Sequence, residues 1–138
     1  MIRKDYIEKQ VEQLALVIAR IISEITNAKA SGKVDSGITI ADDFLKTEFD
    51  VEFAKLAAMD KQHLVDYLIK NKNIHLYKLD LLADVLFATA ELHEKSEKQN
   101  IAKSLYEKTL LIYQYVNNKQ KTFSQIRQEK ISQLNSKL

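Results

Sequence analysis

Residues 14–25, Leu-Ala-Leu-Val-Ile-Ala-Arg-Ile-Ile-Ser-Glu-Ile, form the most apolar stretch of the chain. Around them, apolar residues recur at steps of four and three, which is the spacing of a heptad seam: Ile7, Val11, Leu14, Ile18, Ile21 and Ile25. This periodicity predicts one long amphipathic helix over residues 1–30. Because Leu16, Val17 and Ile22 widen the apolar face beyond one stripe, the helix must be covered on more than one side.

Burial of this helix requires either a groove of its own domain or a second copy of the chain. A symmetric homodimer is the simplest second copy, since one patch then pairs with itself. We therefore predict that the interaction surface is formed by Leu14, Leu16, Val17, Ile18, Ile21, Ile22 and Ile25.

The composition of the whole chain excludes most β-containing folds. Of 138 residues, 46% are hydrophobic, two are glycine and none is proline or cysteine. Average usage predicts about seven prolines in a chain of this length. With no proline and only two glycines, the usual turns of hairpins, sandwiches and dinucleotide-binding loops are missing. We predict an all-α fold, an antiparallel array of five or six helices.

Both glycines, Gly32 and Gly37, lie in residues 31–39, which we interpret as a linker between the first helix and a helical domain over residues 40–138. Thr39 with Asp42 has the spacing of a capping box and predicts a helix start near Ile40. Whether residues 40–58 form one helix or two stays open. Asp60 predicts the start of a further short helix.

The C-terminal half shows two longer helical patterns, which predict a hairpin over about residues 76–118. Ser96 with Gln99 has the spacing of a capping box between them. Thr122 with Gln125 repeats that spacing and predicts a final helix over about residues 122–138 that caps the hairpin. Short connections make these helices antiparallel neighbours.

The spacing of small and aromatic residues in this hairpin resembles a tetratricopeptide repeat. Ala90 and Ala102 lie twelve positions apart, Leu86 precedes the first by four, and Tyr106 follows the second by four. The resemblance implies that these four residues pack the two helices closely together. The chain lacks the glycine and the closing proline of that repeat, and Thr109 replaces a usual alanine.

The opening residues 1–14, Met-Ile-Arg-Lys-Asp-Tyr-Ile-Glu-Lys-Gln-Val-Glu-Gln-Leu, with this hairpin and residues 122–124, Thr-Phe-Ser, resemble a wider family. It consists of short, uncharacterised bacterial all-helical proteins that end in a tetratricopeptide-like (TPR-like) hairpin. The resemblance covers most of the chain and is least clear over residues 30–60. It implies a helical fold and no particular reaction.

Charge is nearly balanced, at a net +2, which does not point to a nucleic-acid partner. Its distribution is uneven, since residues 31–60 carry a net −4 and residues 117–138 a net +4. The basic residues of the C-terminal segment fall on several faces of the predicted helix. We expect that helix to be solvated, with the acidic segment 31–60 as the alternative partner of its charges. The residues concerned are Lys119, Lys121, Arg127, Lys130 and Lys137.

No pattern typical of catalysis is present. The chain has no glycine-rich phosphate loop and no nucleophile motif. Its three histidines, His63, His75 and His93, lack the spacing of a metal site, because His93 and Glu97 straddle a predicted turn. We therefore expect no catalytic residues, no metal and no cofactor.

A short apolar stretch at residues 14–22, followed by Ala28-Lys29-Ala30, has the outline of a signal peptide, but Asp5, Glu8 and Glu12 acidify the region that should be basic. Nine apolar residues are too few for a membrane span. With no cysteine, we expect a cytoplasmic location. The sequence thus predicts a non-enzymatic protein-interaction or scaffold module, self-associating through its first helix. The alternative is a regulatory or small-ligand binding protein with an interhelical pocket lined by Tyr, Phe and His.

Overall fold

The computed structural model describes residues 2–120 and 123–138, and these residues contain helices and no strand. The all-α prediction is therefore confirmed. The elements are α1 (Ile2–Ala30), α2 (Val34–Phe49), α3 (Phe53–Ala58), α4 (Lys61–Asp66), the π-helical turn η1 (Tyr67–Asn71), α5 (Leu76–Lys95), α6 (Gln99–Lys119) and α7 (Gln125–Lys137). The described residues hold seven α-helices, more than the predicted five or six, because the segment between α2 and α5 breaks into short pieces.

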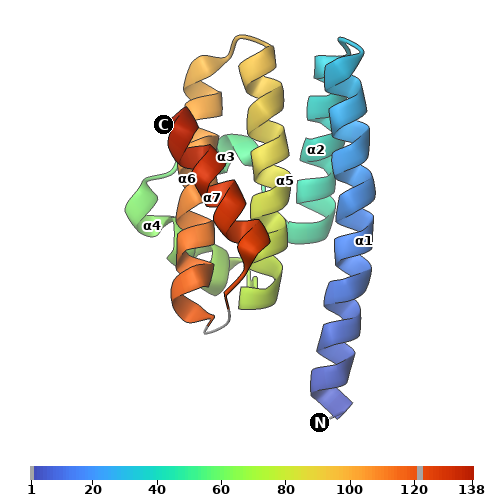
Figure 1. Cartoon of the computed structure of the whole chain (residues 1–138), viewed down its shortest axis with the longest axis vertical. Helices are drawn as coiled ribbons and strands as arrows, with labels where there is room; N and C mark the ends of the chain where they lie inside the picture. Colours follow the sequence, from blue (N-terminus) through green and yellow to red (C-terminus); the bar gives the residue numbers. More distant parts are fainter. Residues whose placement is uncertain (1, 121–122) are drawn as a thin grey trace.

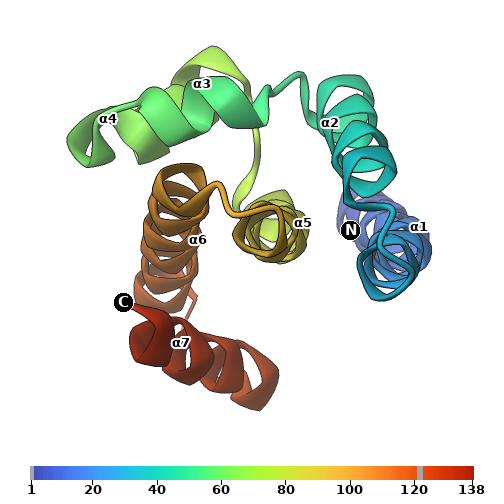
Figure 2. The same cartoon turned by 90° about the horizontal axis from the view of Figure 1, so that it is seen from above.

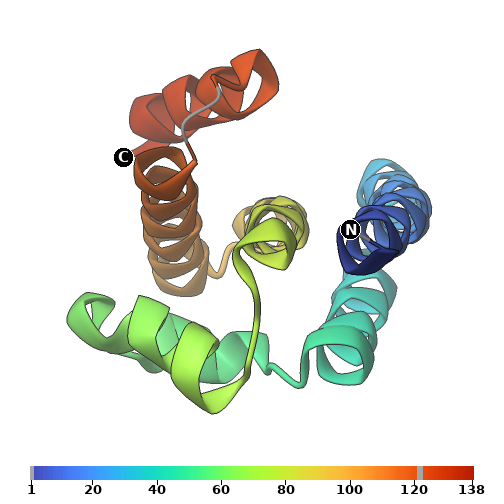
Figure 3. The same ribbon diagram turned by 90° about the horizontal axis from the view of Figure 1, so that it is seen from below.

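Four long helices, α1, α2, α5 and α6, run side by side along the long axis of the molecule, and α7 crosses obliquely beside α6 (Figure 1). Seen from above, α5 lies at the centre. The pair α1 and α2 lies on one side of it, α6 lies on the other, and α3 and α4 lie between α2 and α6 in the arc (Figure 2). The view from below shows the same arc, which leaves α5 uncovered between α1 and α7 (Figure 3).

The central position of α5 follows from its sequence, which is apolar around most of its circumference. Eleven of its 20 residues are buried, including Leu82, Leu86 and Ala90. Such a helix needs neighbours on several sides, and α1, α2 and α6 all pack against it.

The predicted hairpin is formed by α5 and α6, antiparallel and joined by a short turn (Figure 1). All four residues assigned to its packing, Leu86, Ala90, Ala102 and Tyr106, are buried in one apolar cluster. The ring of Phe87 meets that of Tyr106 edge to face at 5.8 Å between centroids. This aromatic pair joins the two helices in addition to the small residues.

The linker predicted at residues 31–39 is wrong, because α2 already begins at Val34 and only residues 31–33 connect the helices. Gly32, at φ +76°, makes the turn. Gly37 has a different role. A Cβ at this position would lie 3.0 Å from the Leu92 side chain and 3.2 Å from the Ala28 Cβ, so the glycine lets α2 approach α1 and α5 closely.

Two predicted capping boxes are wrong, and a third lies outside the described residues. Thr39 is inside α2, where its hydroxyl donates to the Asp35 carbonyl. Ser96 donates to the carbonyl of His93 instead of capping α6. The box at Thr122 falls on an undescribed residue, and the N-cap of α7 is Ser124, whose hydroxyl accepts from the backbone N–H of Arg127 at 3.2 Å.

We predict that Gly37→Ala lowers the free energy of unfolding by about 1 kcal/mol, although alanine is the better helix former. The added methyl group meets the Ala28 Cβ and buried Leu92, so overpacking outweighs the gain in helix propensity. Urea unfolding followed by circular dichroism measures the change. The control is Ser36→Ala at an exposed position one residue earlier, which we expect to be neutral or slightly stabilising. Equal stabilisation by both changes would contradict the packing role of Gly37.

Candidate interaction surface

Most of the predicted interaction residues of α1 are used inside the chain's own core. Leu14, Ile18 and Ile25 are buried. Val17, Ile21 and Ile22 are half-buried, and Ile22 packs against both apolar clusters of the core. The prediction that these residues face a partner needs correction, because α2 and α5 together cover two sides of α1. Only Leu16 of the set stays exposed, with 74% of its surface accessible.

The N-terminal end of α1 extends past the helices that cover it. At 1.5 Å per residue, α1 is about 43 Å long and α2 about 24 Å, so the first turns of α1 pass the end of α2. Figure 1 shows this end of α1 projecting beyond the other helices. The heptad seam nevertheless continues there, with exposed Ile7 and half-buried Val11.

A hollow of about 540 Å³ lies between this end of α1 and the start of α5. Its apolar lining comes from Ile7 and Val11 on α1 and from Leu76 and Tyr77 on α5, with Gln10, Asn73, His75 and Lys78 as the polar part. A second hollow of about 260 Å³ shares Gln10 and Lys78 with it. We call the surface over both hollows the N-terminal groove; its lining is completed by Gln13, Leu14, Val17 and Glu48.

One exposed tyrosine, Tyr77, lines the N-terminal groove, and a second, Tyr6, precedes the lining residue Ile7 on α1. Tyr6 is 61% exposed on α1, and Tyr77 is 55% exposed where α5 begins. Tyrosine combines a large apolar ring with a polar end and is enriched in protein interfaces. The sequence analysis did not single out either residue. The heptad spacing that includes Ile7 was the available signal, but nothing in the sequence showed where α2 would stop covering it.

We predict that Ile18→Ala lowers the free energy of unfolding by about 3 kcal/mol, because it opens a cavity beside a buried seam residue. Leu16→Ala on the opposite side of the same helix should change it by less than about 0.5 kcal/mol. Urea unfolding at low protein concentration measures both. Similar losses for the two variants would mean that Leu16 is covered in solution.

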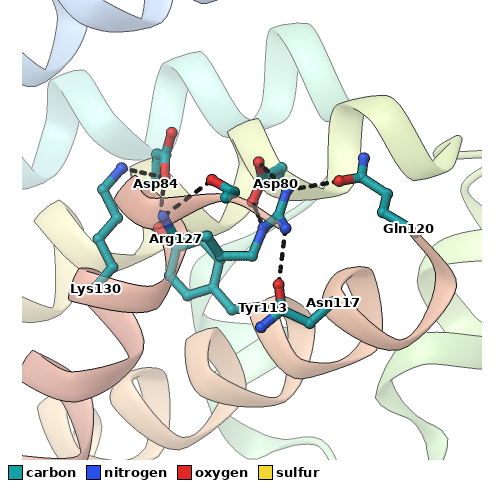
Figure 4. Close-up of polar contacts among 8 residues, drawn as sticks. Asp80, Asp84, Tyr113, Asn117, Gln120, Arg127 and Lys130 are labelled. Carbon is teal, nitrogen blue, oxygen red and sulfur yellow. Dashed lines mark hydrogen bonds and ion pairs between the residues drawn. The ribbon is translucent and has the colours of Figure 1, made fainter. Parts of the chain in front are cut away.

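The C-terminal helix is held to α5 by a polar network that crosses 47 residues of sequence (Figure 4). Arg127 is only 4% exposed. Its Nε and Nη2 donate to the two carboxylate oxygens of Asp80 at 2.9 and 3.0 Å. The same guanidinium donates to Asn117 Oδ1 and Gln120 Oε1, both at 2.8 Å. Such a two-pronged contact is the strongest form of arginine–carboxylate pairing.

Further ion pairs extend this network along α5. Asp84 Oδ1 accepts from Lys130 Nζ at 2.7 Å and from the Tyr113 hydroxyl at 2.5 Å. Burial, and next the charge of Asp84, raise the pKa of Tyr113, so its hydroxyl stays a donor. Lys137 pairs with Glu94 at 3.2 Å.

These pairs correct the expectation for the basic C-terminal segment. Arg127 is buried and Lys130 is half-buried, and both pair with acidic residues of α5 instead of residues 31–60. The structure does not describe Lys121. Local spacing in the sequence could not reveal these ion pairs, because the paired residues lie on different helices and are 46 or 47 positions apart.

One interhelical hollow is too small for the pocket of the alternative interpretation. A hollow of about 160 Å³ opens where α5 is uncovered between α1 and α7, with Phe87, Tyr113 and Asp84 among its lining residues. Cavities that hold small molecules usually measure 300–1,000 Å³. The three histidines lie elsewhere: His93 is buried in α5, and His63 and His75 are exposed. The hollow of about 540 Å³ between α1 and α5 does fall in that range and has His75 and Tyr77 in its lining, so the pocket of the alternative interpretation stays a prediction.

A serine and a lysine on α6, not singled out from the sequence, lie together at the end of α3. Ser104 Oγ donates to the Ala57 carbonyl at 2.5 Å, and Lys108 Nζ donates to Ser104 Oγ at 3.0 Å and to that carbonyl at 3.3 Å. Burial lowers the pKa of Lys108. The hydroxyl proton of Ser104 is donated to the Ala57 carbonyl. The serine and the lysine therefore connect α6 to the end of α3.

His93 is buried beside Phe53, at 4.8 Å between ring centroids. Among the described residues, neither of its ring nitrogens meets a hydrogen-bond partner. Burial, and next the charge of Lys98, lower its pKa below the usual 6.5. Since the unfolded chain then binds a proton more readily than the folded one, stability is lost as the pH falls below about 6.5.

We predict that His93→Leu raises the free energy of unfolding by about 1 kcal/mol at pH 7.5, because it removes an unsatisfied buried polar ring. The gain over wild type should grow at pH 5.5, where the histidine of the unfolded wild type is protonated. Urea unfolding at the two pH values tests this. His63→Gln, at an exposed histidine, is the control for loss of a histidine. The same gain at both pH values would refute the role of His93 protonation.

Within residues 2–120 and 123–138, no three His, Asp or Glu side chains lie close enough together to hold a metal ion. In the part of the chain that the structure describes, no helix combines the length and apolar character needed to cross a membrane. Comparison with protein-family models, with curated proteins and with solved structures found no match to this chain.

Proposed function

We propose that the protein is a non-enzymatic interaction module that self-associates through its N-terminal groove. The observation that carries this proposal is that the heptad seam of α1 extends toward the N-terminus beyond the helices of the same chain that cover it. Ile7 and Val11 continue the line of Leu14 and Ile18, but they face the hollow at the start of α5 instead of a helix. A second copy of the chain would complete the packing of this seam.

The exposed tyrosines supply the central apolar area of the proposed dimer interface. Tyr6 and Tyr77 together expose on the order of 200 Å². The other lining residues of the two hollows enlarge the patch along α1 as far as Val17. Specific interfaces begin at about 600 Å² per partner, so further exposed residues of α1 would have to contribute to the contact.

A two-fold arrangement suits this surface, because each copy offers both a projecting helix end and a hollow. With two α1 helices crossing antiparallel, Tyr6 of each copy would enter the hollow of the other. The exposed Glu8 and Glu12 of one copy would then approach Lys78 at the partner's hollow. The α5–α6 hairpin, TPR-like in its residue spacing, serves as the scaffold that holds Tyr77 in place. Without cysteine, such a dimer can form in a reducing cytoplasm.

We predict that wild-type protein is a dimer at 50 µM and that Ile7→Glu combined with Tyr77→Glu makes it monomeric. The new charges would be buried unpaired in the dimer, whereas in the monomer they stay at exposed positions. Sedimentation equilibrium gives the mass, and circular dichroism checks that the helical content is unchanged.

Leu16→Glu is the matched control, since it also places a charge at an exposed apolar position of α1 but outside the N-terminal groove. This variant should remain dimeric. A wild-type monomer at 500 µM would refute the proposal, and loss of dimer only in Leu16→Glu would place the interface on the opposite face of α1.

A further inference from the structure

Compared with the other long helices, α7 is held to the fold in a distinct way. Only Arg127, Ile131 and Leu134 are buried among its residues. Ile126, at 68% exposure, and the flanking Phe123 turn to solvent. Long charged side chains connect it to α5, and its backbone packs mainly against α6. Charge therefore contributes more to the docking of α7 than to that of α1 or α6.

The acidic residues of α5 match the basic residues of α7 in order. Asp80 pairs with Arg127, Asp84 with Lys130, and Glu94 with Lys137, so the two helices run in the same direction (Figure 1). Between the cations, Ile131 and Leu134 bury their side chains. We call this surface of α5 and α6 the acidic receptor face; it consists of Asp80, Asp84, Glu94, Tyr113, Asn117 and Gln120.

We propose that the acidic receptor face binds a basic amphipathic helix of a partner protein, and that α7 is its intramolecular occupant. The pattern of α7 defines the chemistry of that partner. It carries arginine at one position, lysine three residues later, isoleucine and leucine at four and seven, and lysine at ten. These positions fall on one side of a helix. The basic side chains can therefore contact Asp80, Asp84 and Glu94 while the isoleucine and the leucine pack against the apolar cluster.

Arginine is required at the first position. Its planar guanidinium donates to both oxygens of Asp80 while reaching Asn117 and Gln120. A lysine ammonium is a point charge and cannot make this forked contact. The partner helix is therefore distinguished from other basic helices by that one residue.

A partner can displace α7 because the remaining ion pairs are open to water. The side chains of Lys130 and Lys137 are each 31% exposed. Dissolved salt screens such pairs, so α7 is released more readily as ionic strength rises. In the intact chain α7 competes at the high effective concentration of a tethered segment, which keeps the receptor face closed to weak ligands.

The test uses the full chain and a fluorescein-labelled peptide of residues 123–138 as the probe, measured by fluorescence anisotropy. Arg127→Gln in the chain loosens its own α7 but leaves the acids intact, so this variant should bind the peptide at least ten-fold more tightly than wild type does. Asp80→Asn combined with Asp84→Asn also loosens α7 but removes the receptor charges, so binding should be lost. A peptide with Lys in place of its arginine should bind Arg127→Gln at least ten-fold more weakly.

A second peptide separates the pattern from the particular sequence. It keeps only the arginine, the two lysines, the isoleucine and the leucine at their spacing in an alanine and glutamine background, and its scrambled form is the control. The patterned peptide should bind Arg127→Gln and the scrambled one should not. Equal binding of both would refute the proposed recognition.

Hydrogen exchange checks that each variant releases α7 and keeps the rest of the fold. In Arg127→Gln the amides of α7 should exchange faster than in wild type, while those of α5 and α6 stay protected. If Arg127→Gln fails to fold, Lys130→Gln combined with Lys137→Gln takes its place. Peptide binding no tighter than to wild type, in a variant whose α7 is released, would overturn the proposal. A second result would also overturn it. If the double variant Ile7→Glu with Tyr77→Glu were still a dimer, and its two copies exchanged their α7 helices, α7 would occupy the acidic receptor face of the other copy and not its own.

Discussion

The burial of α5 is the constraint on which the rest of the structure depends. A helix whose apolar residues point in most directions is stable only when it is enclosed, and α1, α2 and α6 each cover one part of it. Gly37 allows α2 to reach it, and the Phe87–Tyr106 pair joins α6 to it. Between α1 and α7 no helix covers α5 (Figure 2), and Asp84 and Glu91 of α5 line a hollow there. The arc of helices therefore follows from the pattern of one central segment.

Both candidate surfaces arise where this enclosure is incomplete. The seam of α1 continues past the end of α2, so Ile7 and Val11 border a hollow instead of a helix. On the other side, the acids of α5 are neutralised by α7 through long side chains, and few apolar residues add to that contact. The two surfaces use different physical forces. The self-association proposed for the first would depend mainly on apolar burial, whereas docking of α7 at the second weakens as salt screens its charges.

Local patterns in the sequence predicted much of the fold and little of the candidate sites. The four-and-three spacing placed Leu14, Ile18 and Ile25 on one apolar stripe that was assigned to an interaction surface, whereas the structure buries them inside the chain. The hairpin residues are all buried. The same spacing could not show that α2 ends before it reaches Ile7. Gly37 was interpreted as part of a linker because glycine breaks helices on average, whereas here its small size allows three helices to meet. Thr39 and Ser96 had the spacing of caps, yet their hydroxyls bond to carbonyls of preceding residues.

The sequence by itself determined that the chain is helical, which residues of each helix are apolar, and that no disulfide is possible, because these properties depend on composition and on short-range periodicity. Only the tertiary structure decided which charges are neutralised and which apolar residues stay uncovered. Arg127 finds Asp80 across 47 residues, and Tyr6 stays in solvent although Ile18 on the same helix is buried. The physical reason is that burial and pairing depend on how far each neighbouring helix extends and where it crosses. Both are set by packing between segments distant in the sequence.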